Sequence, residues 1–187
     1  MGASAATIRT EMQQGTLPRI LSTPTPRWVF MMGKLLGMVG TGLAQMVILI
    51  AATTLVARLM GRENPVWGNN WPGIIALVLA VVFAAVSLGL LVAALARSAE
   101  QASTYSSIAS MVLGMLGGSF IPIENLPDVL AWLPRLTLNY WGIRGFFDLA
   151  TGEKTLAGIV PNLAALLAIG VVLCAAGLWV FARRQEV

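Results

Sequence analysis

The sequence contains no histidine and only one cysteine, Cys174, and these two absences exclude several kinds of site. The usual zinc sites, and catalysis through a Ser/His/Asp or Cys/His group, depend on histidine, and a lone cysteine can form no disulfide within the chain. Charged residues are also scarce. They make up 11% of the chain, against about 25% in a typical soluble domain, which is too few to cover a surface that faces water.

Apolar residues make up 57% of the 187 positions, and they are concentrated in four runs without charge. A helix needs roughly 20 apolar residues to cross the hydrocarbon core of a bilayer, which is about 30 Å thick. The alternative, a soluble protein with very apolar buried helices, is disfavoured by four such runs in so short a chain. The sequence therefore predicts an all-α, polytopic membrane helical bundle with four transmembrane helices, at about 30–57, 73–96, 102–122 and 156–181.

The rest of the chain forms connecting segments that are too short for a soluble domain. Residues 1–28 are polar, and Thr10 with Gln13 is typical of a capping box that opens a short helix. Residues 29–187 are predicted to be one transmembrane domain. Within it, a short external amphipathic helix is predicted at 125–134, either lying on the membrane surface or re-entrant, because four apolar residues share one helical face: Leu126, Val129, Leu130 and Leu133.

Basic residues predict the orientation of the chain rather than a nucleic-acid partner. The net charge of +4 comes from Lys and Arg scattered singly, without a basic block. Four spans place both termini on one side of the membrane. If that side is the cytoplasm, seven of the twelve Lys and Arg lie inside, so cytoplasmic termini are predicted. Asp148 is then placed in an outer loop.

Five small residues follow one stripe of the third predicted span, at i, i+4, i+7, i+11 and i+14. Such a stripe either packs closely on another helix or lines a path through the membrane. Packing is the favoured interpretation, and both stay open. The stripe consists of Ser103, Ser107, Ser110, Gly114 and Gly117.

The sequence shows no means of powering transport by itself. No glycine-rich phosphate loop with Walker spacing occurs. No carboxylate, lysine or histidine is predicted in mid-membrane, where a secondary transporter would relay protons or sodium. The chain is therefore predicted not to be an enzyme and to hold no cofactor or metal, and any transport would be driven from outside the chain.

Several short motifs, in this order and around four spans, resemble the latter part of ABC-2 type transporter permeases. The first is Glu11-x-x-x-Gly15-Thr16-Leu17-x-Arg19, which is similar to the cytoplasmic segment that opens the latter half of these proteins. The others follow at the ends of the predicted spans: Gly33-Lys34, Arg97–Ala102, Gly117–Pro122, Leu126-Pro127 and Tyr140-Trp141.

The resemblance implies an export permease of the bacterial inner membrane that pairs with an ABC ATP-binding subunit, which carries the ATP and Mg²⁺. It implies a dimer with a second copy or a paralogue, and it assigns the stripe of the third span to the dimer interface and the translocation path. It also implies that the coupling element on the ATPase is formed by Glu11, Gly15, Thr16, Leu17 and Arg19. The helix at 125–134 would be the family's re-entrant external element, while the transported substrate stays undefined.

The number of spans leaves an alternative open. Permeases of this family usually have six spans per half, whereas this sequence starts where the third would. The chain is therefore either a fragment, one half completed by another chain, or a truncated or degenerate permease that acts as a non-transporting membrane scaffold. An ion-coupled secondary transporter is disfavoured by the uncharged membrane interior.

Overall fold

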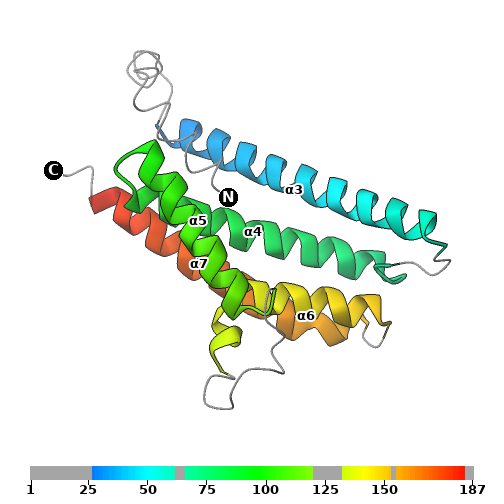
Figure 1. Ribbon diagram of the computed structural model, residues 1–187. Helices are drawn as coiled ribbons and strands as arrows, with labels where there is room; N and C mark the ends of the chain where they lie inside the picture. Colours follow the sequence, from blue (N-terminus) through cyan, green and yellow to red (C-terminus); the bar gives the residue numbers. More distant parts are fainter. Residues whose placement is uncertain (1–26, 62–65, 120–131, 153–154, 184–187) are drawn as a thin grey trace.

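The computed structural model describes residues 27–61, 66–119, 132–152 and 155–183. Throughout these residues the secondary structure is helical, with no strand, which confirms the predicted all-α fold (Figure 1). The elements are α3 Arg27–Leu59, α4 Trp71–Leu95, α5 Ala99–Leu116, the 3₁₀ helix η3 Leu133–Leu136, α6 Leu138–Ala150, the 3₁₀ helix η4 Leu156–Ile159, and α7 Val160–Arg183.

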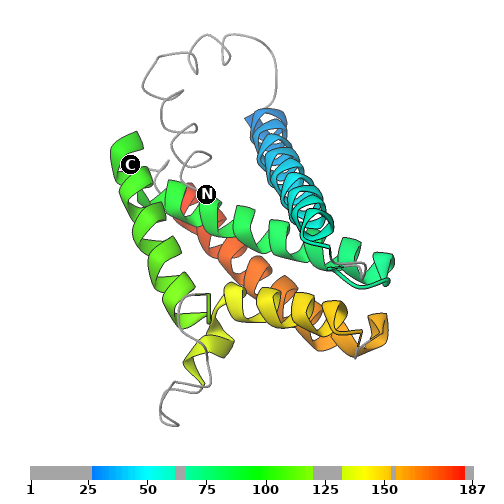
Figure 2. The same cartoon turned by 45° about the vertical axis from the view of Figure 1, so that its right-hand side comes forward.

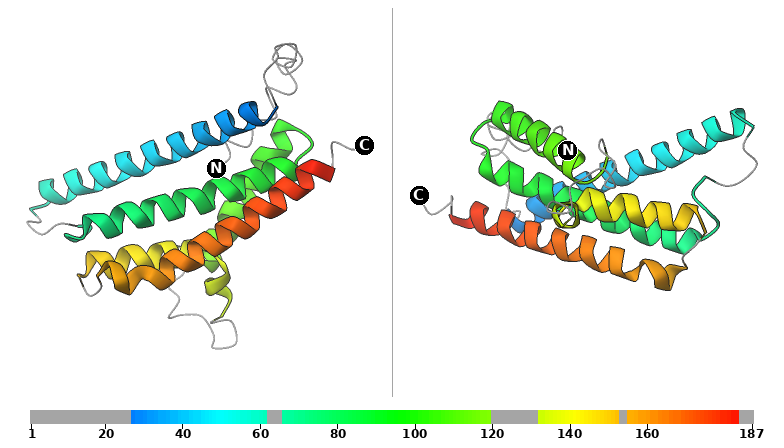
Figure 3. Two further views of the ribbon diagram at one scale, coloured as in Figure 1. Left: turned by 180° about the vertical axis from the view of Figure 1, so that it is seen from behind. Right: turned by 60° about the horizontal axis from the view of Figure 1, so that its bottom comes forward.

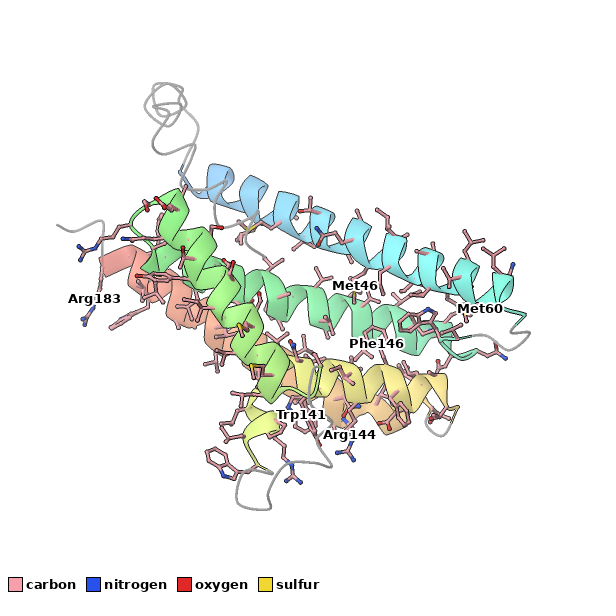
Figure 4. The ribbon with its side chains drawn as sticks, viewed as in Figure 1. Met46, Met60, Trp141, Arg144, Phe146 and Arg183 are labelled. Carbon is pink, nitrogen blue, oxygen red and sulfur yellow. The ribbon has the colours of Figure 1, made fainter. Side chains whose placement is uncertain are left out.

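The long helices lie along one axis, and Met60 and Arg183 mark the two ends of the bundle (Figure 4). Helix α3 runs towards the Met60 end, and α4 returns towards the Arg183 end. Helix α7 is parallel to α4 and packs closely beside it, whereas α6 runs beside both in the opposite direction (Figure 3). Helix α5 crosses α4 obliquely, and α3 lies against α4 on the side away from α5 and α6 (Figure 2).

Among the described helices, three are long and apolar enough to cross a membrane: residues Leu35–Leu59 of α3, all of α4, and Leu156–Arg183 of η4 and α7. The described part of the chain is thus a membrane helical bundle. Helix α5 is not apolar enough to meet the same criterion, because the first half of its 18 residues carries Glu100, Gln101 and four Ser or Thr residues. That α5 is a fourth span therefore stays a prediction.

Helix α4 is the centre of the bundle. It contacts α3, α5, α6 and α7, and its contact with α7 is the most extensive between any two helices of the described chain. Leu77 and Ala84 of α4 are fully buried, together with Ile159 and Leu166 from the last segment. Helix α4 begins where Asn70 Oδ1 accepts a hydrogen bond from Gly73 N–H at 3.2 Å, with Pro72 in the first turn, where no N–H is needed.

Helix α6 corrects the sequence-based expectation. No helix was predicted between 134 and 156, yet Leu138–Ala150 form one that packs on α4 and α7. Thr137 caps it: its hydroxyl accepts a hydrogen bond from Tyr140 N–H at 3.3 Å and donates one to Pro134 C=O at 2.7 Å. The mixture of aromatic and polar residues is explained by burial of only one side of this helix.

The predicted helix at 125–134 lies mostly outside the described residues. Of its final residues, Pro134 was expected to stop the helix. Instead it lies in the first turn of η3, which continues to Leu136. A proline in a first turn costs no hydrogen bond, which explains why the helical turn continues beyond it.

Candidate functional site

The residues proposed to couple the chain to an ATPase all lie outside the described residues. The small-residue stripe is described completely, and it lies along α5. The structure divides it into two parts. Ser103, Ser107 and Ser110 are exposed on the first three turns, whereas Gly114 and Gly117 are buried at the end of the helix.

The oblique course of α5 explains this division. The N-terminal part of α5 meets α4 through a different row of small residues, Ala102 and Ser106, which are both buried. Its C-terminal end meets the start of α6. A Cβ placed on Gly117 would lie 2.8 Å from Thr137 Oγ1 and would also collide with the Asn139 side chain. A glycine is thus required at position 117, where α5 meets α6. The three serines of the stripe are exposed instead.

Two hydroxyl groups of α5 are bonded within the helix. Ser107 Oγ donates to Ser103 C=O and Thr104 Oγ1 donates to Glu100 C=O, each at 3.0 Å. Such bonding to the preceding turn lowers the cost of a hydroxyl in an apolar environment. Ser106 Oγ differs, because it is buried and has no hydrogen-bond partner among the described residues. The exposed stripe can therefore face lipid, a second helix or a solvated path.

The motif Arg97–Ala102 has a clear structural role at the turn between α4 and α5. Ser98 Oγ accepts a hydrogen bond from Gln101 N–H at 3.1 Å, and Gln101 Oε1 accepts one from Arg97 N–H at 2.9 Å. This pair is a variant of the capping box, in which Gln101 accepts from the residue before the N-cap Ser98, and it starts α5 only four residues after α4 ends. The motif thus fixes a tight hairpin at the Arg183 end of the bundle.

Asp148 is a residue whose environment the sequence did not indicate. It was placed in an outer loop, but in the structure it is 6% exposed in the last turn of α6. Asn162 Nδ2 of α7 donates to its Oδ2 at 3.4 Å, and Asn162 is itself 4% exposed. A buried carboxylate needs polar partners, and Asn162 supplies one. The only available signal was the amide at position 162, in an otherwise apolar run.

Two further residues on α6 make side-chain hydrogen bonds: Arg144, which is exposed, and Trp141, which is half-buried. Arg144 points away from the core (Figure 4), and its guanidinium donates to the Tyr140 hydroxyl at 2.5 Å. The Trp141 indole N–H donates to Arg135 C=O at 2.7 Å, which ties α6 to η3. These contacts hold the segment after α5 against the bundle without forming a catalytic group.

The described residues of the site form a helix-packing surface with one exposed side. Among the described residues, no group of three or more His, Cys, Asp or Glu side chains could hold a metal ion. Cys174 is half-buried in α7 without a disulfide partner. What remains is an exposed hydroxyl stripe on an oblique helix beside a rigid pair of helices.

Comparisons with known proteins agree with this description. The model of a family described as "ABC-2 family transporter protein" matches residues 1–179. The linearmycin resistance permease protein LnrN of Bacillus subtilis is 27% identical over 178 residues, 95% of this chain and 44% of that protein. The ABC transporter G family member 7 of Arabidopsis thaliana is 29% identical over 112 residues, 52% of this chain and 15% of that protein. The chain thus spans less than half the length of either relative. No solved structure matches it significantly.

Proposed function

Because this chain belongs to the ABC-2 family of transporter proteins, we propose that it is a membrane-spanning permease subunit of an ATP-driven exporter in a bacterial inner membrane. In this proposal, ATP and Mg²⁺ are bound by a separate ATP-binding subunit, and both termini of the permease lie in the cytoplasm. The chain contributes helices that change their packing when the partner hydrolyses ATP. The family match, which extends over the polar N-terminal segment as well as the helices, is the observation that carries the proposal.

The exposed stripe of α5 supports a dimer with the path at its interface. Helix α5 makes few contacts with the rest of the bundle, and its open side combines the three serines with large apolar side chains such as Ile108 and Met111, at 57% and 62% exposure. Small residues allow close approach of a second helix, and hydroxyls with free lone pairs can line a polar path. A second permease copy, or a paralogue, would cover this side.

The N-terminal segment supplies the proposed connection to the ATPase. Glu11, Gly15, Thr16, Leu17 and Arg19 would contact the ATP-binding subunit, and the segment would pass its rigid-body motion to α3. Helix α3 contacts only α4 extensively, so a shift of α3 would alter its packing against one neighbour.

Affinity purification from native membranes tests the ATPase partner. Tagged wild-type chain should recover an ATP-binding subunit, and the double variant Glu11→Ala/Arg19→Ala should recover several-fold less. A variant of two exposed arginines elsewhere, Arg135→Ala/Arg144→Ala, should leave the recovery unchanged. Wild-type chain that recovers no ATP-binding subunit contradicts the proposal.

Cysteine cross-linking tests the dimer. In a Cys174→Ala background, Ser107→Cys should form a disulfide between two copies on mild oxidation in the membrane. Val172→Cys is the matched control, because Val172 is 66% exposed on α7 and lies outside the stripe. Equal cross-linking at the two positions would argue that the α5 stripe has no special role in pairing.

A further inference from the structure

A groove separates α3 from α4 at the Met60 end of the bundle, where α3 diverges from its neighbour. Its volume is about 680 Å³, within the roughly 300–1,000 Å³ range of ligand sites. Val47, Ala51 and Arg58 of α3 line one wall, and Trp71, Ile75 and Leu79 of α4 line the other. Its floor is formed by buried side chains of α4, Ile74 and Val78, while its rim is open: Val47 is 63% exposed and Ile75 57%.

The lining of the groove is apolar except at one end. Thr54 is part of it, but its hydroxyl donates to Ile50 C=O at 2.7 Å and so is already bonded. Arg58, in the last turn of α3, is the one charged residue of the lining. Within the described residues, its side chain has no hydrogen-bond or carboxylate partner. Trp71 lies at the same end, as tryptophan does at a membrane interface.

The length and the lining of the groove fit a hydrocarbon chain with a charged headgroup. The lining of α3 extends from Leu43 to Arg58, which is about 22 Å at 1.5 Å per residue and more than the roughly 15 Å depth of one leaflet. An acyl chain can therefore lie along the groove with its headgroup at Arg58, the cation at one end.

We propose that this groove binds a phospholipid, with one acyl chain between α3 and α4 and the phosphate paired with Arg58. Guanidinium groups form charge-assisted, bidentate hydrogen bonds with phosphate. The apolar walls accept the chain, and the cation at the interfacial end fixes the headgroup. The bound lipid completes the packing of α3, which the protein alone leaves partly open. This lipid is a structural ligand and is distinct from any transported cargo.

Photo-cross-linking in nanodiscs tests the proposal without requiring transport or an ATPase. The whole chain is reconstituted with phosphatidylglycerol that carries a diazirine in its acyl chain, and labelled residues are mapped by mass spectrometry. Labelling is expected at Ile75 and Leu79 above that at Val172, an exposed residue of α7. Diacylglycerol with the same chain should label the groove less, because it lacks the phosphate.

Two variants separate a specific site from general contact with the bilayer. Ala51→Trp fills the groove, whereas Ala52→Trp places the same side chain on an exposed part of α3 that does not line it. Labelling of the groove should fall about fivefold or more in the first and be unchanged in the second.

Arg58→Ala should reduce labelling by phosphatidylglycerol about tenfold or more, the order expected for one charge-assisted interaction, and Arg58→Lys should retain most of it. Unchanged thermal unfolding midpoints of the variants exclude misfolding. Equal labelling in the two tryptophan variants, or no effect of Arg58→Ala, overturns the proposal. Labelling of Ile75 and Leu79 no higher than that of Val172 also overturns it, because another protein segment then covers the groove.

Discussion

Two glycines of α7 carry the contact between the two most closely packed helices. Gly170 and Gly177 are seven residues apart, so they share one side of α7, and both are buried against α4. A Cβ on Gly170 would lie 2.6 Å from the Phe83 ring, and one on Gly177 would lie 3.1 Å from the backbone nitrogen of Leu91. In a bilayer the hydrophobic effect does not drive helices together, so van der Waals packing at such close contacts stabilises the helix pair.

A larger side chain at this contact should therefore destabilise the bundle. Gly170→Leu is expected to cost about 1–3 kcal/mol through overpacking and to lower the midpoint of thermal unfolding of the purified protein in detergent. Gly40→Leu is the matched control, because Gly40 is exposed on α3 with nothing within 4 Å of its Cβ position. Equal midpoints for the two variants would contradict the role assigned to Gly170.

At the same scale, Asp148 and Asn162 form a buried polar pair between α6 and α7. Asp148 has the appearance of a loop residue because it precedes Thr151 and Gly152, which end α6. Yet it belongs to the last turn of α6, and α7 covers it. Its burial is acceptable because Asn162 donates a hydrogen bond to it.

At the scale of single elements, the turn between α4 and α5 is a rigid joint rather than a flexible loop. The capping box of Ser98 and Gln101 satisfies two N–H groups at the start of α5. Next to it, Val92, Ala93, Ala96 and Ala102 form a small buried cluster of their own. The orientation of α5, and with it the direction in which the serine stripe faces, depends on this joint.

Removal of the cap should weaken the joint measurably. Ser98→Ala is expected to cost about 1 kcal/mol, seen as a lower thermal midpoint of the purified protein. Ser110→Ala changes an exposed serine of the same helix. It should change the free energy of unfolding by no more than about 0.5 kcal/mol and so leave the thermal midpoint close to that of wild type. If both variants unfold at the same temperature, α5 is not held by its cap.

At the scale of the whole molecule, the bundle divides into a tightly packed part and one loosely attached helix. Helices α4, α6 and α7 share the buried core. Helix α3 touches α4 closely at Gly42, where a Cβ would lie 2.9 Å from Val82 Cγ1. The segment after α3 adds a second attachment, because Trp67 donates to Thr53 Oγ1 at 3.1 Å and its ring meets Phe146 of α6 edge-on.

This division predicts that α3 can be displaced without unfolding the core. Gly42→Leu should reduce cross-linking between Met38→Cys and Val86→Cys, which line the same small hollow between α3 and α4, by a short thiol reagent in a Cys174→Ala background. Gly37→Leu has open space around its Cβ position and should not reduce it. A loss of cross-linking together with loss of the folded core would show that α3 is integral to the bundle.

Local composition was enough to establish that the chain is a helical membrane protein, because an uncharged apolar run is a property of some twenty adjacent residues. The motifs also indicated the family. However, which glycines and serines contact another helix was decided by the tertiary structure. Gly170 and Gly40 both lie in apolar runs of the sequence, and the small-residue stripe of α5 is continuous in the sequence. Which of these positions are buried depends on the parallel packing of α4 and α7 and on the oblique crossing of α5. The reason is that the environment of a helix face is set by the neighbouring helix that it contacts.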